Sequence, residues 1–158
     1  MTLLDAEDHF PDLTLNRVGG GSVSLPADLA GVFGVVLVYR GSWCPYCNAQ
    51  LGAFSRATEA LEEQQIKVIA LSVDDGATGA ALVEKNQLMF PVAYGADAGE
   101  VAEALGCFTN DEPAYLQSTG FVLTPDGSVL VAVYSTGAIG RLLPADVLGL
   151  VAHARSAG

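Results

Sequence analysis

The chain has 158 residues, of which 51% are hydrophobic and 16% charged, and its formal net charge is −11 with only seven lysines and arginines. This composition is typical of one globular domain over residues 1–158, and without a basic patch it disfavours nucleic acid and anionic membranes as partners. The first residues lack a basic and apolar leader, and no apolar run approaches the ~20 residues of a membrane span. An odd count of three cysteines argues against a disulfide framework, so we expect a cytoplasmic protein.

Hydrophobic periodicity and turn residues predict an α/β order of elements. A hairpin around the glycines 19–21 comes first, and a strand–helix–strand unit follows it. Pro91 predicts an edge position for the short element that contains it. In chain order we expect strands at 10–15, 22–25 and 35–39, a long helix from Cys44–Pro45, a strand at 67–73, a helix at 77–87, an edge element at 90–94, a helix at 97–105 ended by Gly106, an irregular segment at 107–117, hairpin strands at 121–124 and 129–134, and an amphipathic helix from Pro144.

The segment Trp43-Cys44-Pro45-Tyr46-Cys47 lies where the buried strand 35–39 passes into the long helix. Pro45 fits the first helical turn, because an N–H group at that position would have no hydrogen-bond partner within the helix. Cys44 therefore lies at the helix N-terminus, where free N–H groups and the helix dipole favour a thiolate, the nucleophilic form. Cys47 is one turn deeper and can attack a sulfenic acid or mixed disulfide formed on Cys44.

The rest of the helix has one apolar and one polar side, as a helix packed on a sheet requires. The apolar face follows spacings of three and four through Cys44, Cys47, Leu51, Phe54, Thr58 and Leu61. We expect the remaining surface to carry Asn48, Gln50, Ser55, Arg56, Glu59, Glu62 and Glu63.

Other interpretations of the two cysteines need residues that the chain lacks. An iron–sulfur cluster usually takes four thiolates, and covalent haem needs a histidine where Asn48 stands. A zinc site needs two further ligands, but Cys107, His9 and His153 are isolated in sequence. Two inert core thiols remain an alternative to a redox pair, which the strand-to-helix context favours.

Several further residues have both a structural and a functional interpretation. Arg40, four residues before Cys44, is either a cation for the thiolate or an exposed strand end. Arg141 follows the closing hairpin and could reach the site from the far side, although the sequence favours a position away from it. Cys107 is interpreted as a buried filler, with a second resolving thiol as the alternative. Trp43 and Tyr46 form either an apolar collar around the cysteines or a contact for a partner. His9 and His153 are interpreted as surface residues.

Residues 39–47 and 121–127, together with the N-terminal hairpin, resemble the peroxiredoxin-like redoxins, the alkyl hydroperoxide reductase/thiol-specific antioxidant group of the thioredoxin superfamily. The resemblance runs from about Phe10 to the end. It implies an α/β thioredoxin-like domain, with a central mixed sheet flanked by helices and an N-terminal β-hairpin extension. It also implies hydroperoxide reduction and a thioredoxin- or glutaredoxin-type electron donor, with no bound cofactor and NADPH entering only through the donor's reductase.

The chain departs from the pattern of that group at the residues that activate peroxide. The signature Pro-x-x-x-Thr-x-x-Cys has Leu37 in place of its proline and Gly41 in place of its threonine. The arginine of the neighbouring strand falls at about Ser118. The cis-proline that thioredoxins place opposite their cysteines falls near Thr119, and the closest upstream proline is Pro113.

The sequence therefore predicts a thiol-dependent oxidoreductase in which Cys44 attacks a hydroperoxide, Cys47 resolves the product and Arg40 supplies the positive charge. One alternative is a thiol–disulfide oxidoreductase that acts on disulfide substrates with little peroxidase activity. Another is a redox switch or binding protein that does not turn over. The preferred substrate, the donor and the oligomeric state, a homodimer included, stay open.

Overall fold

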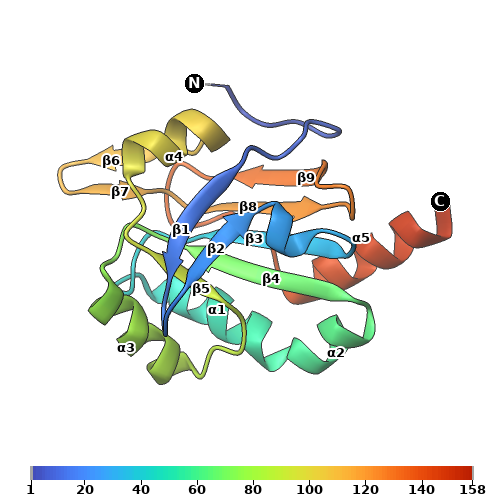
Figure 1. The fold of residues 1–158 in the computed structure, drawn as a ribbon, viewed down its shortest axis with the longest axis horizontal. Helices are drawn as coiled ribbons and strands as arrows, with labels where there is room; N and C mark the ends of the chain where they lie inside the picture. The colour runs from blue at the N-terminus through green and yellow to red at the C-terminus, as the bar shows by residue number, and fades with distance from the viewer. Residues whose placement is uncertain (1, 158) are drawn as a thin grey trace.

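A central seven-stranded sheet with the order β2-β1-β5-β4-β3-β8-β9 organises the computed structural model, which describes residues 2–157 (Figure 1). Parallel and antiparallel pairs occur in the same sheet, since β3 is parallel to β4 and antiparallel to β8. The strands are β1 (Leu13–Arg17), β2 (Ser22–Leu25), β3 (Phe33–Val38), β4 (Ile66–Leu71), β5 (Val92–Tyr94), β6 (Thr109–Asp111), β7 (Ala114–Leu116), β8 (Thr119–Leu123) and β9 (Val129–Tyr134). The helices are η1 (Ala27–Leu29), α1 (Pro45–Arg56), α2 (Thr58–Glu63), α3 (Gly76–Asn86), α4 (Ala98–Leu105) and α5 (Pro144–Ala157).

Alternate side chains of the buried strands pack into two separate cores, one on each face of the sheet. Val36, Val38 and Leu71 lie in the core that the β1–β2 hairpin and α4 cover. Val35 and Leu37 lie in the other core, beneath α1, α2, α3 and α5. The mixed sheet with helices on it and a hairpin before it confirms the expected fold class.

Most of the elements predicted from the sequence are present at nearly the predicted bounds. The hairpins β1–β2 and β8–β9, the parallel pair β3–β4 and the helices α3 and α4 are all there. α5 begins at Pro144 as expected. No helix within residues 2–157 is long and apolar enough to cross a membrane.

The predicted edge position of residues 90–94 is wrong, because β5 lies inside the sheet between β4 and β1. Pro91 precedes the strand and contributes its carbonyl, which accepts a hydrogen bond from the Ala70 N–H at 3.1 Å. The N-terminal hairpin covers the other side of β5, where the Val18 N–H donates to the Val92 carbonyl. A proline at the entry to an interior strand removes no bond of the ladder.

Two further expectations are corrected. The segment 107–117 is not irregular, since it contains the antiparallel hairpin β6–β7. The long helix is broken at Ala57 into α1 and α2, and Thr58 Oγ1 donates to the Ser55 carbonyl at 2.6 Å beside the break. Side-chain hydrogen bonds to the backbone of this kind compete with the helical ladder.

Two polar residues assigned to the surface of that helix are buried instead. The Ser55 hydroxyl donates to the Gln87 carbonyl and accepts from the Met89 N–H. Gln50 donates its side-chain amide to the Leu142 carbonyl at 3.0 Å. Burial of both groups is tolerated because their hydrogen-bonding atoms are paired.

Gly106 ends α4 with a φ of 82°, and a Cβ there would lie 2.6 Å from the Thr2 carbonyl oxygen. We predict that Gly106→Ala lowers the free energy of unfolding by about 1–2 kcal/mol or more, since the left-handed conformation alone costs that much. Gly149→Ala is the control, because Gly149 is exposed inside α5 with open space around its Cα, and there alanine should stabilise by up to about 1 kcal/mol. Urea unfolding measures both. Equal changes in the free energy of unfolding for the two variants would contradict the left-handed, crowded position of Gly106.

Candidate active site

Cys44 caps the N-terminus of α1, as predicted. Its Sγ accepts the N–H of Cys47 at 3.3 Å, and Pro45 occupies the first helical turn. The Asn48 side-chain amide donates to the carbonyls of Ser42 and Cys44, both at 2.9 Å. The Asn48 bonds fix the loop before the helix, and the bond from the Cys47 N–H holds the Cys44 sulfur. Residues of α1 itself therefore set the direction of the Cys44 side chain.

Cys47 lies one turn further along α1, and both thiols are free and fully buried. The backbone N–H of Arg40, just after β3, donates to Cys47 Sγ at 3.3 Å. The strand and the helix therefore meet at the two sulfurs.

The side chain of Arg40 turns toward the thiols and is half-buried. Its Nη1 lies 3.8 Å from Cys44 Sγ, while Nε donates to Gln117 Oε1 at 2.9 Å and Nη2 to the Tyr115 hydroxyl at 3.1 Å. The guanidinium also lies over two rings, 4.9 Å from the centre of Trp43 and 5.3 Å from that of Tyr115. The β6–β7 hairpin thus positions Arg40, because Tyr115 belongs to β7.

A second arginine reaches the sulfurs from the loop before α5. Arg141 Nη2 lies 3.1 Å from Cys47 Sγ and 3.6 Å from Cys44 Sγ. Its Nη1 donates to Gln50 Oε1 at 2.6 Å and its Nε to the Ala138 carbonyl at 2.7 Å. The sequence favoured a position away from the site, and the structure places Arg141 closer to the thiols than Arg40. The sequence around Arg141 does not indicate this contact, because 97 residues separate Arg141 from Cys44.

The surroundings of the two thiols shift their pKa values in opposite directions. Burial disfavours the thiolate of Cys44, but hydrogen bonds from the Cys47 side chain and N–H, a hydrogen bond from Arg40 and the charge of Arg141 together lower its pKa. Burial raises the pKa of Cys47, and the hydrogen bond to Cys44 adds to this, against the opposing contributions of the Arg40 N–H and Arg141. The geometry therefore favours a thiolate on Cys44 and a protonated Cys47 beside it.

Cys107 lies apart from this pair. It is buried in the core on the opposite face of the sheet, and burial raises its pKa to about 11. Its surroundings match those of a packing residue. His9 and His153 are exposed, and within residues 2–157 no cluster of three metal-ligating side chains occurs.

Trp43 and Tyr46 flank the cysteines with about half of each side chain exposed, at 54% and 53%. The Trp43 ring also packs edge-on against Tyr115, with 4.9 Å between ring centres. The two rings therefore lie at the protein surface beside the buried thiols.

The residues at which the chain departs from the resembled signature have structural explanations. A Cβ on Gly41 would lie 2.2 Å from Trp43 Nε1, so the indole fills the space of a threonine side chain. Leu37 is fully buried in β3. Ser118 is buried just before β8, Thr119 begins that strand, and Pro113 lies in the turn between β6 and β7.

The fold is that of the thioredoxin-like peroxiredoxins. Peroxiredoxin 6 of Arenicola marina superposes with a TM-score of 0.83 at 17% identity, covering 96% of this chain and 74% of that one. AhpC of Mycobacterium tuberculosis gives a TM-score of 0.82 at 19% identity, over 99% of this chain and 96% of that one.

Sequence comparison establishes the family. The pattern of the AhpC/TSA family matches residues 6–132, and the chain belongs to that family. It is 27% identical over 143 residues to a peroxiredoxin of Methanothermobacter marburgensis and 29% identical over 140 residues to one of Chlorobaculum tepidum. These alignments cover 87% and 85% of this chain, which spans 66% and 65% of the length of the two relatives.

We predict that Gly41→Thr, which introduces the signature residue, displaces Trp43 and lowers the free energy of unfolding by about 1–3 kcal/mol, the usual cost of overpacking. Because Trp43 is the only tryptophan, its fluorescence reports the movement directly. The matched control is Gly41→Thr in a Trp43→Ala background, where the clash is absent and the cost should shrink. An equal cost in both backgrounds would show that the indole does not occupy this space.

We predict that Cys44 reacts with iodoacetamide at a pH below the ~8.5 of an ordinary thiol, and that its rate falls only when the pH drops below its lowered pKa. Cys47 should react at higher pH. Arg141→Met removes a positive charge and should move the Cys44 profile to higher pH, whereas Arg155→Met, at an exposed position of α5, should leave it unchanged. Mass spectrometry of the alkylated peptides identifies the cysteine. Faster labelling of Cys47 at neutral pH would reverse the two assignments.

Proposed function

We propose that the chain reduces hydroperoxides through a dithiol/disulfide cycle in which Cys44 is the nucleophile and Cys47 the resolving thiol. The observation that carries the proposal is the position of Cys44 Sγ, at the N-terminus of α1 and within reach of two guanidinium groups. The names of the relatives support the same reaction, since those cited above are peroxiredoxins.

In the first step the Cys44 thiolate attacks the terminal oxygen of the hydroperoxide. The O–O bond breaks, the alcohol or water leaves after taking up a proton, and Cys44 becomes a sulfenic acid. In the second step the sulfur of Cys47 loses its proton and attacks Cys44, which releases water and forms the disulfide. The two thiols together supply the two electrons that the peroxide takes up.

In this proposal Arg40 and Arg141 stabilise the reacting oxygen in place of the signature threonine and arginine. The attack places negative charge on the departing oxygen, and donors preorganised around it lower the barrier. Arg40 Nη1 and Arg141 Nη2 point to Cys44 Sγ from two different segments, so a peroxide bound at the sulfur lies between two positive charges. Arg141 also lies 3.1 Å from Cys47 Sγ, where it favours the thiolate needed for the second step.

Regeneration requires a dithiol donor of the thioredoxin or glutaredoxin type, which reduces the disulfide by thiol exchange. The half-exposed rings of Trp43 and Tyr46 offer this donor an apolar contact beside the site. The cycle needs no bound cofactor, and NADPH serves only the donor's reductase. We place the protein in the cytoplasm, where a disulfide is transient, and a homodimer is compatible with the family.

A second candidate function is thiol–disulfide exchange with little peroxidase activity. It is favoured by one observation, the glycine and indole at the position of the signature threonine, which leave that hydroxyl out of the site. A redox switch without turnover is the third candidate. It would consume one equivalent of oxidant and stop.

We predict slow but measurable NADPH consumption when the chain is supplied with thioredoxin reductase, thioredoxin and hydrogen peroxide. Arg40→Met should lower the peroxide-dependent rate by about 10²–10³, as loss of one donor to a developing oxyanion does. Lys85→Met, at an exposed position on α3, removes the same charge and should leave the rate unchanged.

A disulfide substrate separates the candidate functions in the same assay. Arg40→Met should spare most of the reaction with a small disulfide, because that reaction develops no oxyanion. If the unaltered chain consumes no NADPH with peroxide but reduces disulfides readily, the peroxidase proposal is wrong and the exchange function replaces it. Consumption that stops after one equivalent of peroxide would identify a switch.

A further inference from the structure

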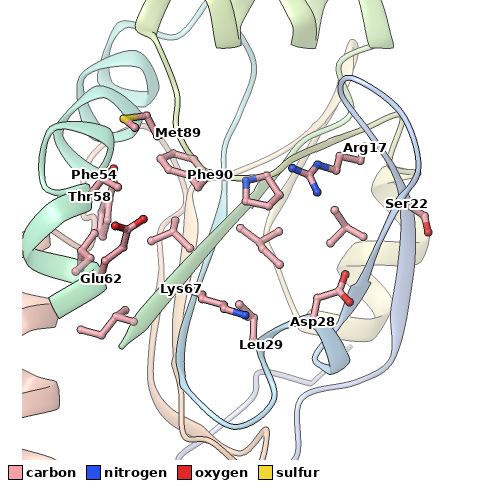
Figure 2. Close-up of a pocket in the computed structure, with 16 residues that line it drawn as sticks. Arg17, Ser22, Asp28, Leu29, Phe54, Thr58, Glu62, Lys67, Met89 and Phe90 are labelled. Carbon is pink, nitrogen blue, oxygen red and sulfur yellow. The ribbon is translucent and has the colours of Figure 1, made fainter. Parts of the chain in front are cut away.

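A cavity of about 520 Å³ lies at the amino end of β4, far from the thiols. Figure 2 shows its lining residues, with Phe54 and Glu62 of α1 and α2 on one side and Arg17 and Asp28 on the other. Phe54 is ten residues beyond Cys44 on the same helix, about 15 Å along its axis. The cavity is therefore separate from the candidate active site, and what it binds does not depend on the proposed function.

The cavity exists because the sheet is incomplete at this point. β5 has three residues and pairs with β4 only at Ala70 and Leu71. The amino-terminal part of β4, residues 66–69, pairs with β3 on one edge, and no described strand pairs with its other edge. β4 is thus an interior strand at its carboxyl end and an edge strand at its amino end.

The free edge presents unpaired backbone groups to the cavity. Along β4 the backbone groups of successive residues point to opposite edges, so Leu71 bonds toward β3, with its carbonyl accepting from the Tyr39 N–H. Ala70 points the other way and donates to the Pro91 carbonyl. Val68, two residues earlier, faces the same way as Ala70, and its N–H and carbonyl make no hydrogen bond to any residue that the structure describes. Unpaired backbone groups on a strand edge are available to an added strand.

The two walls of the cavity suit the two faces of an extended chain. Phe54 and Leu61 line the helical side, and Val23 and Leu29 line the hairpin side, all of them buried apolar side chains. A strand lying against Val68 would direct alternate side chains to these two walls. An acyl chain or another purely apolar molecule would fill the space but leave the Val68 groups unpaired.

The charged side chains that line the cavity indicate which charge a bound segment would carry beside them. Lys67 and Arg17 are exposed, line the cavity, and form no ion pair or side-chain hydrogen bond with another described residue. Asp28, on the same side, already accepts the Ser24 N–H at 2.8 Å. An acidic side chain of the bound segment on the hairpin side would meet two available cations.

We propose that this cavity binds an extended segment of another polypeptide as an added strand on the free edge of β4. The segment hydrogen-bonds through its backbone to Val68, places apolar side chains alternately on the two walls, and directs an acidic side chain toward Lys67 and Arg17. This is recognition by strand addition, in which main-chain bonds supply affinity and the walls supply selectivity.

The probe is a capped, fluorescently labelled hexapeptide of the order Thr-Val-Leu-Val-Glu-Ser, titrated into the reduced full chain labelled with ¹⁵N. At a peptide concentration ten times its Kd, hydrogen exchange of the Val68 amide should slow about tenfold, since about one molecule in eleven remains free. The same peptide N-methylated at its four central residues cannot donate these bonds and should not bind. Both peptides are measured by fluorescence anisotropy.

Charge reversal tests the contact at the mouth of the cavity. Lys67→Glu should weaken the binding of the peptide about threefold to fivefold, the value of an exposed ion pair, and a peptide with lysine in place of glutamate should recover the loss. Lys85→Glu, an exposed position on α3, makes the same change in net charge and should leave binding unchanged. Circular dichroism checks that each variant is folded.

Three outcomes would overturn the proposal. The Val68 amide could remain fast-exchanging at millimolar peptide, or the N-methylated peptide could bind equally well. Alternatively, Val68 protection without peptide that rises with protein concentration, together with a dimer in sedimentation that Lys67→Glu dissociates, would assign the edge to a second copy of this chain.

Discussion

The charge of a buried thiolate at Cys44 has to be balanced by groups that the chain holds in place around it. Water cannot do this, because both sulfurs of the pair are fully buried. The helix N-terminus supplies the Cys47 N–H, and Arg40 and Arg141 approach the sulfur from different segments. Burial and the hydrogen bond to Cys44 keep Cys47 protonated, against the opposing contributions of the Arg40 N–H and Arg141. The proposed division of roles between the two cysteines rests on this balance.

Much of the surrounding structure serves to position the two guanidinium groups. The β6–β7 hairpin holds Arg40 through the Tyr115 hydroxyl and ring. Gln50 fixes Arg141 and is itself fixed by the Leu142 carbonyl, so a polar residue is buried in the apolar layer between α1 and the loop before α5. The Trp43 ring completes the stack on Arg40 and occupies the space above Gly41. The glycine at the position of the signature threonine is thus coupled to the way in which this chain holds Arg40.

What the sequence predicted well is local. Turn glycines, alternating strands and Pro45 locate the hairpins and the start of α1, because each depends on residues close in the chain. The sequence did not place Arg141 at the thiols, and it assigned Gln50 to the surface and β5 to an edge. Each of these three features depends on a partner far away in sequence. Gln50 was placed on the surface as a polar residue, and its partners lie more than 90 residues later. β5 was assigned to an edge because of Pro91, and only the returning N-terminal hairpin makes it interior.

The central claim is that Cys44 and Cys47 act together as a dithiol that a peroxide oxidises. The most direct measurement oxidises the reduced chain with one equivalent of hydrogen peroxide, alkylates the remaining thiols and maps the peptides by mass spectrometry. The account predicts a Cys44–Cys47 disulfide with Cys107 alkylated, and a sulfenic acid trapped on Cys44 when Cys47→Ser removes the resolving thiol. A dominant bridge between Cys44 and Cys107, or a sulfenic acid on Cys47 in the reciprocal Cys44→Ser variant, would contradict it.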